Sequence, residues 1–279
     1  MAENYVDVNR YKVGANQVLL EKDPVAEEEP LLIQLRQQEQ TQVFSLTMRT
    51  PGEDKELAFG LLFSEGVIKG KNDVESLDYL LDSSKEPKNI LEVRLSDKVT
   101  LETARFERHL TSYSGCGLCG KTSLQALELK QSRAFKTPDL KLSNQLVKTL
   151  KELLAEQPLF SLTGGVHAAG LIYIHDGKLA TESAPFFEDV GRHNALDKLI
   201  GHELLNNDLA QSGLLVLSGR IGFELVQKAI MAGFSTIIAL GAPSHLAIRA
   251  ANQFDVALIG FAKDNSFNLY TSHRELITT

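Results

Sequence analysis

Residues 213–262 read GLLVLSGRIGFELVQKAIMAGFSTIIALGAPSHLAIRAANQFDVALIGFA, and this stretch decides the fold class. Three short apolar runs, GLLVLS, STIIAL and VALIGFA, have the length and composition of buried strands. Between them, FELVQKAIMAG and PSHLAIRAANQF show helical periodicity, and Gly233 should end the first of these two helices. Strands that alternate with helices usually pair in parallel and bury both faces of their sheet. The stretch therefore predicts an α/β architecture with a mostly parallel sheet.

The residues before this stretch extend the same pattern. RHNALDKLIGHELL (192–205) has helical periodicity, and LSNQLVKTLKELLAEQ (142–157) is an amphipathic helix with Ser143 as its N-cap. AGLIYIHDGKLATES (169–183) is typical of a hairpin, with its turn at Asp176-Gly177. A final hairpin is predicted from VALIGFA and FNLYT.

The N-terminal region has a different sequence pattern. Residues 1–30 are polar and acidic, as in a loose arm or an edge strand, and residues 30–52 contain two β-type runs around a polar turn. A helix should follow, with Thr50 as N-cap, Pro51 in the first turn and Glu53 completing a capping box. We expect an α+β N-terminal region over residues 1–140, which carries the cysteine loop, and an α/β cofactor-binding domain over residues 141–279.

The composition is that of an ordinary globular protein, with 43% apolar and 23% charged residues. The net charge of −7 argues against a nonspecific nucleic-acid surface, because phosphate binding needs clustered Lys and Arg. The first residues, MAENYVDVNRYKVG, lack the apolar region of an export signal, and no apolar run approaches the roughly 18–20 residues that span a bilayer. We expect a cytoplasmic chain that binds neither nucleic acid nor a membrane.

The only two cysteines, Cys116 and Cys119, lie in the segment TSYSGCGLCGKT. In a reducing compartment, a close pair of thiols is more often catalytic or metal-binding than structural. A zinc site would need further ligands from histidines, and a redox pair should open a helix directly after a strand, unlike the preceding RFERHLTSYSG. A sulfur-handling thiol needs access and activation, which the small residues and the nearby Lys121 supply. The two cysteines indicate a chemical role for the thiols, but the sequence of this segment does not identify the reaction.

A polar cluster at a predicted helix start, EDVGRHNALDK, indicates a binding site. An acid that can pair with a base edge stands close to an arginine that can hold a phosphate through two hydrogen bonds. The candidate ligand-binding residues of this cluster are Asp189, Arg192 and His193.

Two predicted strands lead directly into helices through similar turns. At the carboxyl edge of a parallel sheet, such a turn directs backbone N–H groups and the helix dipole towards an anion. Gly241–Ser244 forms one of these turns, and the other contains the candidate residues Ser218, Gly219 and Arg220. Together with the Asp189 cluster, the two turns predict a nucleotide-sized crevice.

The segment TGGVHAAG places His167 after an apolar stretch. Zinc deaminases carry a His-x-Glu motif with a C-x-x-C motif downstream. Here Ala169 occupies the Glu position and the C-x-x-C motif lies upstream, so the sequence disfavours deaminase chemistry. A structural and a functional role for His167 are about equally compatible with the sequence.

Six motifs follow one another from about Arg49 to Thr271: RTPGEDKELAFGLLFSEGVI, SGCGLCGK, TGGVHAAGL, EDVGRHNALDKLIG, SGRIGFELVQKAIMAG and GFAKDNSFNLYT. Each motif is modest by itself, but six of them in order are highly specific. In this order they resemble the FdhD/NarQ family of formate dehydrogenase accessory sulfurtransferases.

The resemblance implies a sulfur carrier. Such a protein takes persulfide sulfur from a cysteine desulfurase and passes it to the molybdenum bis(molybdopterin guanine dinucleotide) cofactor of formate dehydrogenase. The resemblance implies that Cys116 carries the persulfide with Cys119 as its partner. The cofactor is a bound substrate, and the family's cofactor-binding segment corresponds to Phe261, Ala262, Lys263, Asp264, Asn265 and Ser266.

The resemblance also implies a cytidine deaminase-like α/β domain with an added N-terminal region, in a homodimer without a metal of its own. Two other function classes stay open. A non-enzymatic chaperone would bind the molybdenum cofactor while its cysteines are dispensable, and a zinc hydrolase of the deaminase class would hold a metal. Replacement of Cys116 and metal analysis separate these possibilities.

Overall fold

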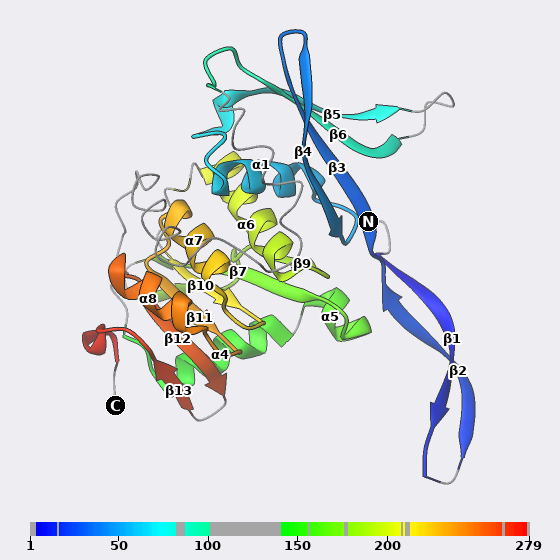
Figure 1. Cartoon of the computed structure of the whole chain (residues 1–279). Helices are drawn as coiled ribbons and strands as arrows, with labels where there is room; N and C mark the ends of the chain where they lie inside the picture. Colours follow the sequence, from blue (N-terminus) through cyan, green and yellow to red (C-terminus); the bar gives the residue numbers. More distant parts are fainter. Residues whose placement is uncertain are drawn as a thin grey trace.

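The C-terminal half is built on one mixed sheet, in a computed structural model that describes residues 4–15, 17–81, 87–100, 141–155, 157–175, 178–207, 209, 213–263 and 266–277. Within these residues the sheet has seven strands in the order β13-β12-β11-β10-β7-β8, and β9 also pairs with β7 (Figure 1). The strands are β7 His167–His175, β8 Lys178–Ala180, β9 Phe186–Asp189, β10 Gly213–Leu217, β11 Thr236–Ala239, β12 Ala257–Lys263 and β13 Ser266–Leu269. The sheet and the helices that cover it give the α/β class.

The prediction of a mostly parallel sheet is wrong. Among the described strands of this sheet only β10–β11 and β11–β12 pair in parallel, whereas β7 is antiparallel to β8, β9 and β10, and β13 is antiparallel to β12. Tight hairpins join antiparallel neighbours, and parallel neighbours need a crossover. The predicted hairpins β7–β8 and β12–β13 are therefore both present and account for two of the antiparallel pairs. The other two antiparallel pairs are β7–β9 and β7–β10. They arise because β9 folds back along β7, and helix α6 (Arg192–Asn207) then returns the chain to β10 on the other side of β7.

Helices cover both faces of this sheet (Figure 1). One face packs its side chains, such as Leu215 and Ile237, against α6, α7 (Phe223–Ala232) and α8 (His245–Gln253). The opposite face packs against α4 (Asn144–Ala155). Since successive strand residues point to opposite faces, the two hydrophobic clusters use alternate residues of the same strands.

The helix ends were largely readable from the sequence. The Ser143 hydroxyl accepts a hydrogen bond from the Leu146 N–H at 3.2 Å, as predicted for the N-cap of α4. Helix α7 ends at Gly233, whose φ of 81° is the left-handed conformation that glycine adopts most easily. The Ser244 side chain caps α8. The short helix α5 (Pro158–Thr163) was not predicted.

The N-terminal region contains a second sheet in the order β4-β3-β6-β5 and a separate two-stranded hairpin. The hairpin extends away from the rest of the molecule (Figure 1), which agrees with the predicted arm. Helix α1 (Asp54–Ser64) lies between the second sheet and α6 (Figure 1). The strands are β1 Tyr5–Val13, β2 Val18–Ala26, β3 Glu29–Gln37, β4 Gln40–Arg49, β5 Val74–Leu81 and β6 Pro87–Leu95, and two 3₁₀ turns are Lys71–Asp73 and Arg274–Leu276.

The predicted cap of α1 is wrong. The helix starts at Asp54, and its N-cap residue Glu53 has a φ of 48° and no side-chain capping bond. The Thr50 side chain instead contacts Val190, just after β9, and the Glu53 side chain contacts Lys198 on α6. One hydrophobic cluster runs from β3 and α1 through α6 to the central sheet. The division at residue 140 stays a prediction.

Candidate functional site

Two turns at the carboxyl ends of β10 and β11 are bound directly to each other. The Gly241 N–H donates to the Gly219 carbonyl at 3.2 Å, and the Ile221 N–H donates to the Ala242 carbonyl at 3.0 Å. A Cβ atom on Gly241 would lie 2.6 Å from the Gly219 carbonyl oxygen, so this approach requires glycine. The predicted meeting of the two turns is confirmed.

The next strand, β12, reaches the same edge. The Phe261 N–H donates to the Gly241 carbonyl at 3.1 Å, and the Phe261 side chain is exposed. The same residue has a φ of 50°, an uncommon backbone conformation for a bulky side chain. Ala262 is buried, Lys263 and Ser266 are exposed, and Asp264 and Asn265 lie outside the described residues. The predicted cofactor segment thus begins beside the Gly241 turn.

The antiparallel strand β7 brings His167 to this edge from the other direction. Ala169 pairs with Leu217, so the start of β7 lies beside the end of β10. The Ser218 N–H donates to the Ala168 carbonyl at 3.0 Å, and the Ser218 hydroxyl accepts from the Ala168 N–H at 2.8 Å. Ser218 therefore fixes the start of β7 through its hydroxyl oxygen.

The His167 ring lies against Gly219. A Cβ atom at position 219 would be 3.2 Å from His167 Nδ1. Burial lowers the pKa of His167 below its ordinary value, the Arg192 guanidinium lowers the same pKa further, and the Asp189 carboxylate opposes both effects. At pH 7 the imidazole is therefore neutral. His167 was not among the predicted binding residues, because only the antiparallel pairing of β7 with β10 places it there.

Arg192, at the start of α6, reaches the same turn, and the next residue, His193, reaches α7. The Arg192 Cδ atom would lie 3.9 Å from a Cβ atom on Gly219. Within the described chain, the buried Nε of Arg192 has no hydrogen-bond partner. His193 Nε2 lies 3.1 Å from a carboxylate oxygen of Glu224, and this hydrogen bond lowers the pKa of the Glu224 carboxyl. All three predicted turns therefore converge.

We call this group the carboxyl-edge site, and it consists of His167, Arg192, His193, Ser218, Gly219 and Arg220. Arg220 is exposed, and none of the ion pairs between described residues involves it. The backbone N–H groups of Gly219 and Arg220 donate no hydrogen bond to any described residue. Unpaired N–H groups next to two arginines favour an anion.

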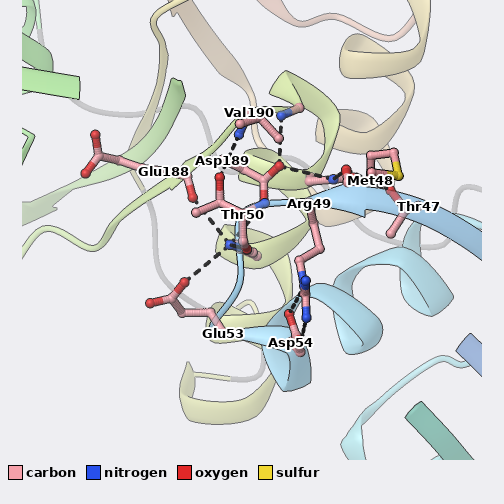
Figure 2. A network of polar contacts seen from close by, with 12 residues as sticks. Thr47, Met48, Arg49, Thr50, Glu53, Asp54, Glu188, Asp189 and Val190 are labelled. Atoms are coloured by element: carbon pink, nitrogen blue, oxygen red, sulfur yellow. Dashed lines mark hydrogen bonds and ion pairs between the residues drawn. The ribbon is translucent and has the colours of Figure 1, made fainter. Parts of the chain in front are cut away.

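Asp189 has a different position from the one predicted. Its side chain is fully buried, and its carboxylate is occupied by protein donors (Figure 2). One oxygen accepts from the Gly191 N–H at 2.8 Å and from the Asn194 amide at 3.1 Å. The other accepts from the Thr50 N–H at 3.1 Å and lies 3.0 Å from the Lys198 ammonium. Burial raises the pKa of the Asp189 carboxyl, and the Lys198 ammonium opposes that effect.

Cys116 and Cys119 lie outside the described residues. Among the described residues, no group of three or more His, Cys, Asp or Glu side chains is placed to hold a metal ion. A helix long and apolar enough to cross a membrane is likewise absent from the described chain.

The order of the motifs and the sequence comparisons together decide the family. The sequence profile of the FdhD/NarQ family matches residues 26–277. The chain belongs to the FdhD/NarQ family. It is 39% identical over 272 residues to the "Sulfur carrier protein FdhD" of Sulfurisphaera tokodaii, with 97% of this chain and 98% of the relative covered. The protein of the same description from Streptomyces coelicolor is 39% identical over 269 residues, with 94% and 92% covered.

A crystal structure shares the FdhD/NarQ fold seen here. It is provisionally described as a formate dehydrogenase accessory protein from Desulfotalea psychrophila, and it superposes with a TM-score of 0.70 over 98% of this chain and 100% of that chain. At 22% identity this similarity shows the fold alone.

Proposed function

We propose that this FdhD/NarQ family member is a sulfurtransferase. In this proposal Cys116 takes persulfide sulfur from a cysteine desulfurase, and the chain delivers it to the molybdenum bis(molybdopterin guanine dinucleotide) cofactor of a formate dehydrogenase. Relatives described as sulfur carrier proteins, at 39% identity over nearly the full chain, support the carrier role. The structural observation that supports the cofactor as substrate is the carboxyl-edge site.

The carboxyl-edge site has the chemistry of a phosphate-binding site. Arg192 has an unpartnered Nε in the described chain, Arg220 is exposed, and the N–H groups of Gly219 and Arg220 are unpaired there. A diphosphate offers the several acceptor oxygens that such donors need. Each of the two guanine dinucleotide parts of the cofactor supplies one diphosphate, and the exposed ring of Phe261 at the same edge provides an apolar surface for a base.

The roles of the other residues follow from their surroundings. The neutral His167 imidazole can donate or accept one hydrogen bond without adding charge. The hydroxyl oxygen of Ser218 accepts a hydrogen bond from the Ala168 N–H, so the hydroxyl would donate its hydrogen to a ligand oxygen. Lys263 and Ser266, both exposed on β12 and β13, extend the donors along the same edge.

The proposed sulfur transfer moves one sulfur atom from the cysteine of the desulfurase to Cys116. The Cys116 thiolate attacks the outer sulfur of the desulfurase persulfide, the sulfur–sulfur bond in the desulfurase breaks, and the desulfurase cysteine leaves as a thiolate. A new sulfur–sulfur bond then holds the same sulfur atom on Cys116. Small residues around the two cysteines allow this approach, and Lys121 is the nearest cation in sequence.

Mass spectrometry after incubation with a cysteine desulfurase and cysteine tests this step. We expect a mass increase of about 32 Da, one sulfur atom, on the peptide that contains Cys116. Cys116→Ser should abolish the adduct. Cys119→Ser is the matched control, because it removes a thiol from the same segment and should leave the sulfur on Cys116. No adduct on the wild-type protein contradicts the carrier role.

The rival chaperone function makes a different prediction in cells. If the chain only bound the cofactor, Cys116→Ser would leave formate dehydrogenase activity intact. We expect that activity to be lost instead, while GDP binding by purified Cys116→Ser stays at the wild-type level.

The finer architecture is also part of the proposal. The alternation β10-α7-β11-α8-β12 supports a cytidine deaminase-like domain. We further propose that the chain is cytoplasmic and forms a homodimer. Light scattering of the purified chain tests the dimer.

A further inference from the structure

Two buried ion pairs involve residues of helix α6, and the two pairs connect this helix to different parts of the protein. Lys198 lies 3.0 Å from Asp189, and both side chains are fully buried. Asp197 lies 2.8 Å from Lys228, and it also accepts from the Ser64 hydroxyl at 3.1 Å. The first pair contacts the turn that leads into Arg192. The second pair joins α6 to α7 and α1.

The Lys198 pair connects the N-terminal region to that turn. The Lys198 ammonium donates to the Thr50 carbonyl at 3.0 Å and to the Glu53 carboxylate at 3.3 Å. It also donates to the Glu188 carbonyl at 3.4 Å. The residues in this network follow β4 on one side and end β9 on the other (Figure 2).

Thr50 binds the turn with both its backbone and its side chain. Its N–H donates to the Asp189 carboxylate at 3.1 Å, and its hydroxyl accepts from the Val190 N–H at 3.1 Å. Asp189 in turn binds the Gly191 N–H. Three consecutive residues before Arg192 are therefore held by buried or partly buried hydrogen bonds.

Arg192 itself has little to hold it. Its Nε has no partner among the described residues, yet its side chain lies beside Gly219. Because no ion pair with a described residue directs the Arg192 side chain, its place beside Gly219 depends on the backbone that carries it. That backbone is fixed by Thr50, Asp189 and Lys198, which we call the positioning network.

We infer that the positioning network holds Arg192 against the Gly219 turn, so that Thr50 of the N-terminal region helps to set the affinity of the carboxyl-edge site for the phosphates of a guanine nucleotide. This inference rests on the proposed function. Asp189 acts through the protein in this role and does not contact the ligand.

A purely structural role is the alternative, because removing one partner of a buried ion pair leaves an uncompensated charge and destabilises a protein. Asp197→Asn controls for this effect. Asp197 is on the same helix as Lys198, and Asp197→Asn removes the buried carboxylate that pairs with Lys228, just as Asp189→Asn removes the buried carboxylate that pairs with Lys198. Asp197 touches no residue of the carboxyl-edge site. Both variants should lose thermal stability.

Calorimetric titration with GDP, below the melting temperature of each variant, separates the two roles. We expect Asp189→Asn to weaken GDP binding by about tenfold or more, as for the loss of a hydrogen bond to a charged group. Asp197→Asn should bind GDP as the wild type does. Thr50→Val keeps the branched side chain and removes only the acceptor for Val190, so it tests the network even if Asp189→Asn fails to fold.

A double-mutant cycle with Arg192→Ala shows whether the network acts through this arginine. In the Arg192→Ala background, Asp189→Asn and Thr50→Val should have little further effect on GDP affinity, whereas independent effects would add. Additive losses, wild-type affinity in folded Asp189→Asn or Thr50→Val, or an equal loss in Asp197→Asn would overturn the inference while the proposed site stands. Wild-type protein that does not bind GDP would overturn the proposed site itself.

Discussion

The Asp197 carbonyl on α6 occupies the space that a side chain would need at Gly60 on α1. A Cβ atom at position 60 would lie 1.8 Å from the Asp197 oxygen, and a Cβ atom at Gly201 would lie 1.8 Å from the Glu56 oxygen. The two helices therefore touch backbone to backbone, and each contributes a glycine at the crossing. This contact joins the N-terminal region to the α/β part of the chain.

We expect Gly60→Ala to destabilise the protein by about 3 kcal/mol or more, because overpacking a contact between two backbones cannot be relieved by a rotamer change. In an ordinary helix interior the same substitution stabilises by roughly 0.5–1 kcal/mol. Urea unfolding measures the difference. Gly70→Ala is the matched control, since nothing lies within 4 Å of its Cβ position. Equal stability of the two variants would contradict the crossing.

The elements of the α/β part could be predicted, but their pairing could not. Local periodicity identified β10, α7, β11 and α8, and glycine identified the end of α7. The direction of β7 was not readable, because a hairpin pattern does not say on which side the strand joins a sheet. His167 was consequently missed as a member of the carboxyl-edge site.

The segment at Thr50 shows why a strong local signal can mislead. A threonine followed three residues later by glutamate satisfies the pattern of a capping box. The same side chains can serve any nearby N–H or ammonium group, and here Thr50 and Glu53 bind Val190 and Lys198. These partners lie about 140 residues further along the chain, where a local pattern carries no information.

Asp189 illustrates the same limit in the site. The sequence suggested an acid that pairs with a base edge, whereas the tertiary position of Lys198 gives the buried Asp189 carboxylate an ammonium partner. The arginines were easier to interpret. Arg220 follows a strand directly and precedes a helix, so its place at the carboxyl edge was set by the order of the elements.

His167 should make stability depend on pH. Its folded pKa is lowered, so the unfolded chain binds the proton more readily once pH falls below the ordinary value of about 6.5. The unfolded state then carries more protons, and the free energy of unfolding decreases as pH is lowered through this window. In His167→Gln this part of the pH dependence should vanish. Urea unfolding measured between about pH 5 and pH 8 checks it. His175→Gln removes an exposed imidazole from the other end of β7 and should retain the wild-type dependence.

Purified protein should lack stoichiometric zinc. The sequence has two thiols and no Glu in the His-x-Glu position, and the described residues contain no cluster of three metal-ligating side chains. Structural zinc sites use four such ligands, and catalytic sites use three. Elemental analysis after dialysis provides the measurement. About one zinc per chain that disappears in both Cys116→Ser and Cys119→Ser would revive the hydrolase function.

Arg220 offers the most direct test of the nucleotide site. Its guanidinium is exposed beside unpaired N–H groups, so its loss should remove a charged contact to phosphate without harming the fold. Arg220→Ala should weaken GDP binding by roughly 1.5–3 kcal/mol, or about 10- to 150-fold. The exposed Arg94 on β6, in the N-terminal sheet, provides the control: Arg94→Ala removes the same charge from the protein and should leave GDP affinity unchanged. Calorimetry on the three proteins at one salt concentration distinguishes a local contact from a general effect of net charge. If Arg220→Ala binds GDP as tightly as Arg94→Ala does, the phosphates do not lie at the Gly219 turn, and the segment from Phe261 to Ser266 becomes the better candidate for the whole site.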